Sequence, residues 1–154
     1  METATEPSER ELVITRIFDA PRSLVFKAWT EPERQAQWLG PRGFNSKILS
    51  SAKGPGDDYR YEMRNPEGGD HWQQGQVREM REPERLVFTS YWTDAAGKAT
   101  TAETVVTLTF EDVGGKTRLT LRQTGFESVN ARDMHRGGWN SSFDCLGEYL
   151  AGAR

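Results

Sequence analysis

Cysteine and histidine are scarce in this 154-residue sequence, which has one cysteine, Cys145, and two histidines. A single cysteine excludes an internal disulfide framework and is typical of a reducing compartment, so we expect a cytoplasmic protein. Zinc needs three or four converging ligands, and the two histidines lie far apart with no cysteine at ligand spacing, so no metal site is predicted. No cofactor is predicted either, because no strand–Gly-x-Gly-x-x-Gly–helix unit is present to hold a nucleotide.

Long apolar runs and an excess of basic charge are also missing. No segment is apolar for long enough to span a membrane, and no basic stretch followed by an apolar one marks a signal peptide. The formal net charge is -3, which argues against nucleic acid as the main partner. Hydrophobic residues make up 35% of the chain, and five tryptophans add large side chains for burial. We therefore expect a flexible tail over residues 1–10 and one folded domain over residues 11–152.

Alternation of apolar and polar residues predicts a sheet. In the clearest case, Tyr59, Tyr61 and Met63 alternate with charged residues. The predicted strands cover residues 12–18, 44–49, 59–63, 71–80, 86–92, 104–110 and 119–123. Short connections such as Gly114-Gly115 predict hairpins, and therefore an antiparallel meander.

Two short helices and one long helix complete the pattern. Pro21 is suited to the start of the first helix. Thr30 and Glu33 have the spacing of a capping box for the second helix, which we expect to reach Trp38. The long helix is predicted over residues 128–151, with Trp139 at the centre of an apolar stripe. That stripe comprises His135, Trp139, Ser142, Phe143, Leu146 and Leu150.

This order predicts an α+β fold in which a curved antiparallel sheet wraps around the long C-terminal helix. One helix cannot fill the whole concave face of such a sheet, so we expect a cavity that binds a small apolar or amphipathic molecule. The candidate ligand-binding residues are the inward-facing side chains Trp38, Phe44, Tyr59, Tyr61, Met63, Gln73, Phe88, Trp92, Val106, Leu108, His135, Trp139 and Phe143. The alternative for many of them is that they simply fill a core.

The two histidines have different expected roles. His71 is expected at the surface, at the start of a strand. His135 is either a core histidine with a satisfied hydrogen bond or a polar group in the pocket that hydrogen-bonds a ligand hydroxyl or carbonyl. In both cases burial would favour the neutral ring and lower its pKa.

No catalytic residue is predicted. Most carboxylates alternate with apolar residues and therefore face solvent, whereas acid–base catalysis needs two groups that point into the cavity. Cys145 lies one step off the apolar stripe and is expected to be a small buried hydrophobe. The pattern favours a binding protein over an enzyme.

Several segments resemble the heat-shock-protein-90 ATPase activator homologue family, within the START-like (SRPBCC, birch-pollen-allergen-like) superfamily. They are FDAPRSLVFKAW at 18–29, EPERQAQWLGPRGF at 31–44, GQVRE at 75–79, PERLVF at 83–88 and HRGGW at 135–139. The resemblance covers residues 11–150. The chain departs from the family at Leu39, where a second tryptophan is common, and at Gly54-Pro55-Gly56, where a double glycine is common.

The resemblance implies a helix-grip fold and a small hydrophobic ligand-binding or carrier protein. It also implies two alternatives. One is a co-chaperone-like stress protein with a chaperone partner, and the other is a cyclase- or hydratase-type enzyme that uses the same cavity.

Overall fold

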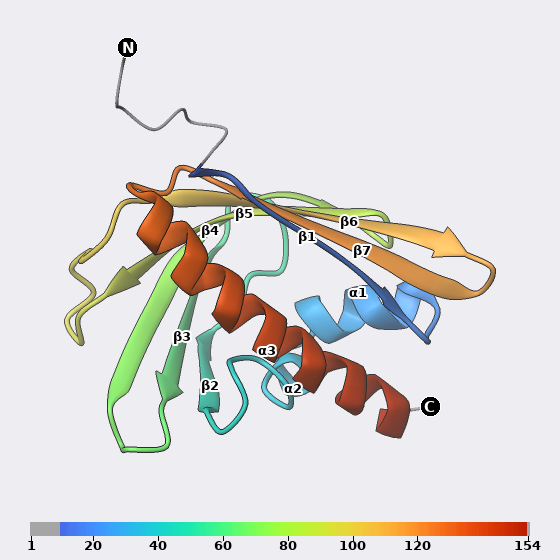
Figure 1. Cartoon of the computed structure of the whole chain (residues 1–154), viewed down its shortest axis with the longest axis horizontal. Coiled ribbons are helices and arrows are strands. Elements are labelled where there is room, and N and C mark those ends of the chain that lie inside the picture. The colour runs from blue at the N-terminus through green and yellow to red at the C-terminus, as the bar shows by residue number, and fades with distance from the viewer. Residues whose placement is uncertain (1–9, 154) are drawn as a thin grey trace, which may run out of the picture.

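The computed structural model describes residues 10–153 of the chain (Figure 1). The tail predicted over residues 1–10 lies outside the described residues, apart from Arg10. The elements are β1 (Leu12–Phe18), α1 (Arg22–Thr30), α2 (Pro32–Gln35), β2 (Asn45–Ser50), β3 (Asp58–Arg64), β4 (Asp70–Arg81), β5 (Arg85–Thr93), β6 (Thr104–Val113), β7 (Lys116–Thr124) and α3 (Val129–Ala153).

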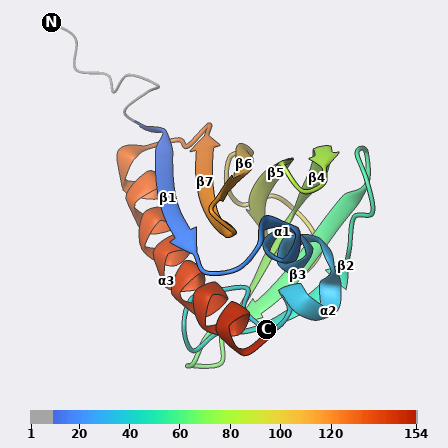
Figure 2. The same ribbon diagram turned by 90° about the vertical axis from the view of Figure 1, so that its right-hand side faces the viewer.

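The strands form one seven-stranded sheet in the order β1-β7-β6-β5-β4-β3-β2, in which all neighbours are antiparallel. Figure 2 shows the sheet bending from β1, beside α3, around to β2 on the opposite side, with α1 and α2 between α3 and β2. This arrangement confirms the predicted α+β helix-grip fold. The strands β6 and β7 extend further than predicted, because Gly114 and Gly115 both take positive φ and allow a tight two-residue turn.

The predicted capping box is wrong. Thr30 is the last residue of α1, and its hydroxyl donates back to the carbonyl oxygen of Phe26 at 3.1 Å. Thr30 lies inside α1, one residue before the N-cap position of α2, so it is not placed to cap that helix. The N-cap of α2 is instead Glu31, whose carboxylate accepts from Arg34 at 2.6 Å. The helix α2 ends at Gln35 rather than at Trp38.

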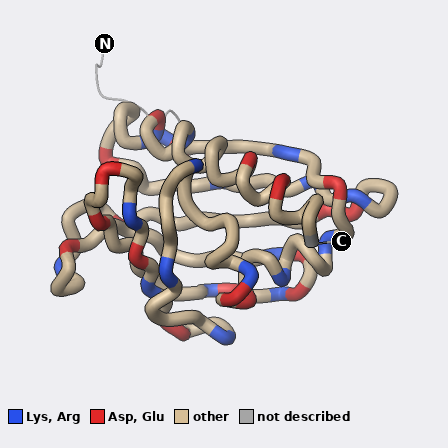
Figure 3. The backbone as a smooth tube through the Cα atoms, turned by 90° about the horizontal axis from the view of Figure 1, so that it is seen from below, with Lys and Arg blue, Asp and Glu red and all other residues tan. Residues whose placement is uncertain are grey.

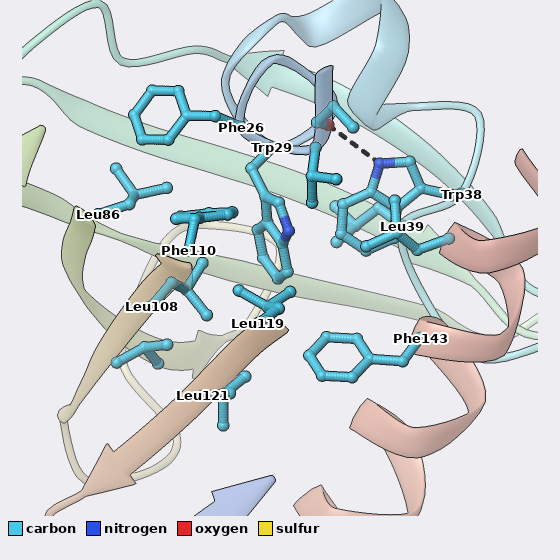
Figure 4. Packing of buried hydrophobic residues seen from close by; sticks show 14 of the residues in the cluster. Phe26, Trp29, Trp38, Leu39, Leu86, Leu108, Phe110, Leu119, Leu121 and Phe143 are labelled. Carbon is cyan, nitrogen blue, oxygen red and sulfur yellow. Dashed lines mark hydrogen bonds between the residues drawn. The ribbon is translucent and has the colours of Figure 1, made fainter. Parts of the chain in front are cut away.

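The core lies at the end of the sheet that α1 and α2 cover (Figure 4). Trp29 meets Trp38 edge to face, with ring centroids 4.7 Å apart. The indole Nε1 of Trp38 donates to the carbonyl oxygen of Ala28 at 2.9 Å, which fixes the loop after α2 against α1. Buried side chains from α1, the strands and α3 surround this pair, including Phe26, Leu108, Phe110, Leu119, Leu121 and Phe143.

The two halves of α3 are packed differently. Phe143, Leu146 and Leu150 in the C-terminal half are almost completely buried. Residues 129–141 in the N-terminal half include no buried side chain. On the β1 side, Arg16 donates to Asp144 at 2.6 Å. The C-terminal half therefore anchors the helix, and the N-terminal half lies over a less filled part of the sheet.

Candidate functional site

A pocket of about 420 Å³ lies under the N-terminal half of α3. Its walls come from the loop between α2 and β2, from the adjacent strands β3, β4 and β5, and from α3. The lining residues are Leu39, Gly40, Pro41, Phe44, Met63, His71, Gln73, Trp92, Met134, His135, Gly138, Trp139 and Ser142. Met134 is 70% exposed and lies at the rim, so the pocket opens to solvent.

Strand register brings the sheet side of the pocket together. Met63 is paired with His71, and Gln73 is paired with Trp92. Alternate residues of a strand point to the same face, so His71 and Gln73 share the face on which the pocket lies. Four side chains from three neighbouring strands therefore form one continuous wall.

The loop wall depends on a glycine with a special backbone conformation. Gly40 has a φ of +99°, a value that residues with a side chain rarely adopt. An added Cβ would also lie 3.0 Å from the hydroxyl of Ser46. That hydroxyl donates to the carbonyl oxygen of Leu39 at 2.7 Å, which holds the loop against β2.

Trp139 forms part of the helix wall, and a hydrogen bond to a buried side chain fixes its ring. Its indole Nε1 donates to Oε1 of the fully buried Gln123 at 2.8 Å. Nε2 of Gln123 donates to the hydroxyl of Thr104, also at 2.8 Å, and Thr104 donates to the carbonyl oxygen of Ser90. Because the indole N–H is bonded to protein, Trp139 contributes aromatic surface rather than a donor.

His135 lies next to Trp139 on the pocket wall, and both of its ring nitrogens have protein partners. Nε2 accepts from the indole Nε1 of Trp92 at 3.1 Å, and Nδ1 donates to the carbonyl oxygen of Ala131 at 2.9 Å. Burial lowers the pKa of His135, and the bond to Ala131 opposes that shift in part. The ring is therefore neutral at pH 7.5, and a ligand would have to displace Trp92 to reach Nε2.

Six of the predicted ligand-binding residues line this pocket: Phe44, Met63, Gln73, Trp92, His135 and Trp139. The other seven are buried elsewhere in the core: Trp38, Tyr59, Tyr61, Phe88, Val106, Leu108 and Phe143. The reason is that α1 and α2 fill the far end of the concave face. The sequence pattern does not reveal this filling, so it predicts a single cavity over the whole face.

In that filled end, Tyr59, Tyr61 and Phe88 line a small void of about 30 Å³. The phenol of Tyr61 accepts from Gln35 at 3.0 Å, and the phenol of Tyr59 donates to the carbonyl oxygen of Thr89 at 2.5 Å. Burial raises the pKa of both tyrosines, so both stay un-ionised.

The predicted binding set lacks seven lining residues: Leu39, Gly40, Pro41, His71, Met134, Gly138 and Ser142. His71 is exposed, as expected, but its ring lies 6.3 Å from that of Trp92 at the mouth of the pocket. Strand alternation with Gln73 is the sequence signal that could have identified it. The loop residues carry no such signal, because their position depends on contacts with β2 and α3.

A second hollow of about 450 Å³ lies on the opposite face of the sheet, where Arg60, Gln74 and Tyr91 are among its lining residues. Arg60 is already bonded to Gln74 and Thr93. The lining of this hollow is mostly polar, so the apolar pocket is the better candidate for a ligand site.

Charge is absent from the apolar pocket, since no Asp, Glu, Lys or Arg is among its lining residues. Figure 3 shows acidic and basic residues intermixed along the chain.

Residues 10–153 contain no cluster of three or more His, Cys, Asp or Glu side chains placed to hold a metal ion. In the same part of the chain, no helix has the length and apolar character needed to cross a membrane. The arrangement can hold an apolar molecule, but it offers no pair of carboxylates for acid–base chemistry.

Comparison with known proteins gives a consistent result. The profile of the family described as Activator of Hsp90 ATPase homolog 1-like protein matches residues 19–151. The AHSA1 protein from Silicibacter pomeroyi is 25% identical, with a TM-score of 0.85 over 94% of this chain and 99% of that one. A protein from Chromobacterium violaceum is also 25% identical, with a TM-score of 0.83 over 92% and 96%. No curated protein matches the sequence.

Proposed function

The chain belongs to the family of Activator of Hsp90 ATPase homolog 1-like proteins, and we propose that it binds a small, largely apolar molecule in the pocket under α3. The observation that carries the proposal is an uncharged pocket of about 420 Å³ walled by Phe44, Met63, Trp92 and Trp139. Sites for small molecules are commonly concave and apolar, with volumes in this range and a few placed polar groups.

The size of the pocket supports useful affinity. A ligand that buries about 200 Å² of apolar surface gains roughly 5 kcal/mol at ~25 cal/mol per Å². Loss of translational and rotational freedom offsets part of that gain. The N-terminal half of α3 includes no buried side chain, so this wall can adjust to an occupant at little cost in core packing.

The test is a titration with N-phenyl-1-naphthylamine, an uncharged probe that becomes fluorescent in apolar surroundings. We expect saturable one-to-one binding, together with a change in the emission of Trp92 and Trp139. Native mass spectrometry of the purified protein would identify any molecule that co-purifies with it.

Two neighbouring glycines provide a matched pair of variants. A Cβ on Gly138 would point toward Pro41 at 3.9 Å in the pocket, whereas a Cβ on Gly137 would meet nothing within 4 Å. Gly138→Phe should therefore abolish probe binding, and Gly137→Phe should leave it unchanged. Equal binding by both variants would place the probe outside this pocket and overturn the proposal.

A second candidate comes from the description of the family, which names an activator of the heat-shock protein 90 ATPase. On this alternative the chain acts as a co-chaperone, and its partner is that ATPase. Measuring the ATPase rate of the purified chaperone with and without this protein tests the alternative. Stimulation that persists in Gly138→Phe would assign the co-chaperone activity to a surface separate from the pocket.

A cytoplasmic location is part of the proposal. It is supported by the single cysteine, since the chain has no second cysteine with which to form an internal disulfide. Fractionation of the source cells would test it.

A further inference from the structure

Two buried polar side chains on neighbouring strands meet at the pocket wall. Nε2 of Gln73, on β4, donates to the hydroxyl oxygen of Ser90, on β5, at 2.6 Å.

This hydrogen bond fixes the orientation of the Gln73 amide. The group that faces Ser90 is therefore the NH₂ of Gln73, which leaves the carbonyl Oε1 as the free end of the amide. Gln73 is 7% exposed and lines the pocket. Within the described residues no hydrogen bond reaches this Oε1, and because it is not among the fully enclosed atoms without a partner, it is open to the pocket.

Three aromatic side chains of the surrounding wall already use their N–H donors within the protein. Trp92 donates to His135, His135 donates to Ala131, and Trp139 donates to Gln123. Two further polar side chains line the pocket: Ser142, whose hydroxyl has no hydrogen bond to the described part of the chain, and His71 at the mouth, whose Nε2 accepts from Nδ2 of Asn65 at 3.1 Å. The pocket therefore offers the amide acceptor of Gln73, the hydroxyl of Ser142, the imidazole of His71 at its mouth, aromatic surface and no Asp, Glu, Lys or Arg side chain.

We propose that the pocket selects an uncharged apolar molecule with a hydroxyl group, which donates its hydrogen bond to Oε1 of Gln73. This inference rests on the proposed function and deepens it. A carboxylate would meet an acceptor with no cation to balance it, and a ketone would leave the Gln73 oxygen unpaired.

Three probes of similar size test the proposal by displacement of N-phenyl-1-naphthylamine at pH 7.5. They are 2-naphthol, 2-methylnaphthalene and 2-naphthoate. We expect 2-naphthol to bind about tenfold more tightly than 2-methylnaphthalene, the order of one hydrogen bond, and 2-naphthoate to bind more weakly than either. Equal affinity for 2-naphthol and 2-methylnaphthalene, or tight binding of 2-naphthoate, would overturn the inference and leave the proposed function standing. Binding of no probe at all, N-phenyl-1-naphthylamine included, would overturn both.

Substitutions on β4 test the role of Gln73 itself. Gln73→Met should reduce the affinity for 2-naphthol to that for 2-methylnaphthalene, while the affinity for 2-methylnaphthalene stays unchanged. The control is Gln74→Met, because Gln74 lies on the opposite face of β4 and bonds to Tyr91. Gln74→Met should bind 2-naphthol more tightly than 2-methylnaphthalene by the same factor as the parent.

Ser142→Ala provides a second measurement, and it leaves the hydrogen bond between Gln73 and Ser90 intact. It should keep most of the preference for 2-naphthol, because the acceptor in the proposal is Gln73. Loss of the preference in Ser142→Ala, with retention in Gln73→Met, would assign the hydroxyl contact to Ser142 and overturn the proposal.

Discussion

Gly75, in the middle of β4, allows two strands to approach closely. A Cβ at this position would lie 1.9 Å from the carbonyl oxygen of Thr89 and 2.9 Å from the ring of Tyr59. The Tyr59 ring lies across the glycine and reaches Thr89, while the backbone N–H of Gln76 bonds to the Thr89 hydroxyl at 2.9 Å. A glycine inside a strand often marks such a close approach or a sharp bend.

We predict that Gly75→Ala is strongly destabilising. The new methyl group would collide with backbone rather than with a flexible side chain, so β4 and β5 would have to separate. A loss of about 3 kcal/mol or more is expected, at the upper end of overpacking effects. Urea unfolding measures it, with Gly54→Ala as the control, because a Cβ at Gly54 meets nothing within 4 Å. A loss below about 1 kcal/mol would show that the strands tolerate the separation.

His135 makes the stability of the fold depend on pH. Burial holds its pKa in the folded protein below the value near 6.5 of an unfolded chain. As the pH falls below about 6.5, the unfolded chain takes up the proton first, so folding stability falls. Above that pH, the stabilising contribution of the neutral ring is complete.

His135→Phe should therefore be less stable than the parent at pH 8, by about 1–2 kcal/mol, because Trp92 loses its acceptor. The difference should shrink as the pH is lowered from 7 toward 5, since the variant has no proton to take up at this position. Urea unfolding at several pH values measures both effects. A difference that is constant with pH would contradict the role assigned to the neutral ring.

At the scale of elements, α3 is the part of the fold that separates core from pocket. Its C-terminal half is held by Phe143, Leu146 and Leu150, and by the contact of Arg16 with Asp144. Its N-terminal half carries the adjacent glycines Gly137 and Gly138. Each glycine lowers helix stability, by up to about 1 kcal/mol relative to alanine.

We predict that Gly137→Ala stabilises the protein by about 0.5–1 kcal/mol. The position is exposed, is helical and has open space around it, so only the gain in helix propensity remains. Thermal unfolding followed by circular dichroism measures the change. A decrease in stability would mean that α3 needs flexibility at this point to pack on the sheet.

At the scale of the whole molecule, one end of the concave face is filled and the other is open. The indole of Trp139 lies 5.9 Å from Phe143, yet Trp139 is half-buried and borders the pocket, whereas Phe143 is fully buried. Phe143 also contacts Phe18 and Trp29. The residue that anchors α3 is therefore Phe143, one helical turn after Trp139, which lies at the centre of the predicted stripe.

Phe143→Ala should cost about 3–5 kcal/mol, the usual range for a buried aromatic residue. Trp139→Ala should cost less, despite its larger ring, because part of that ring already faces the pocket. Urea unfolding of the two variants in parallel tests whether the C-terminal half of α3 belongs to the core while the N-terminal half borders the pocket. If Trp139→Ala costs as much as Phe143→Ala, the N-terminal half of α3 is part of the core.

The elements and their order follow from patterns that are local in the sequence. Alternation at Tyr59, Tyr61 and Met63, and the helical stripe from Ser142 to Leu150, depend on local periodicity, which a single chain displays directly. Hairpin turns such as Gly114-Gly115 then restrict the sheet to an antiparallel order. For the same reason, the inward-facing candidates of the site could be named from the sequence.

Which inward residues meet in the pocket and which fill the core depends on contacts between distant segments of the chain. Periodicity places Tyr61 and Gln73 on the same face, but α2 covers Tyr61 through Gln35 and leaves Gln73 at the pocket. Likewise, whether His135 offers a free nitrogen depends on Trp92, which lies 43 residues earlier in the chain. Contacts between distant segments follow from how the helices close over the sheet, and local sequence patterns carry no information about that closure.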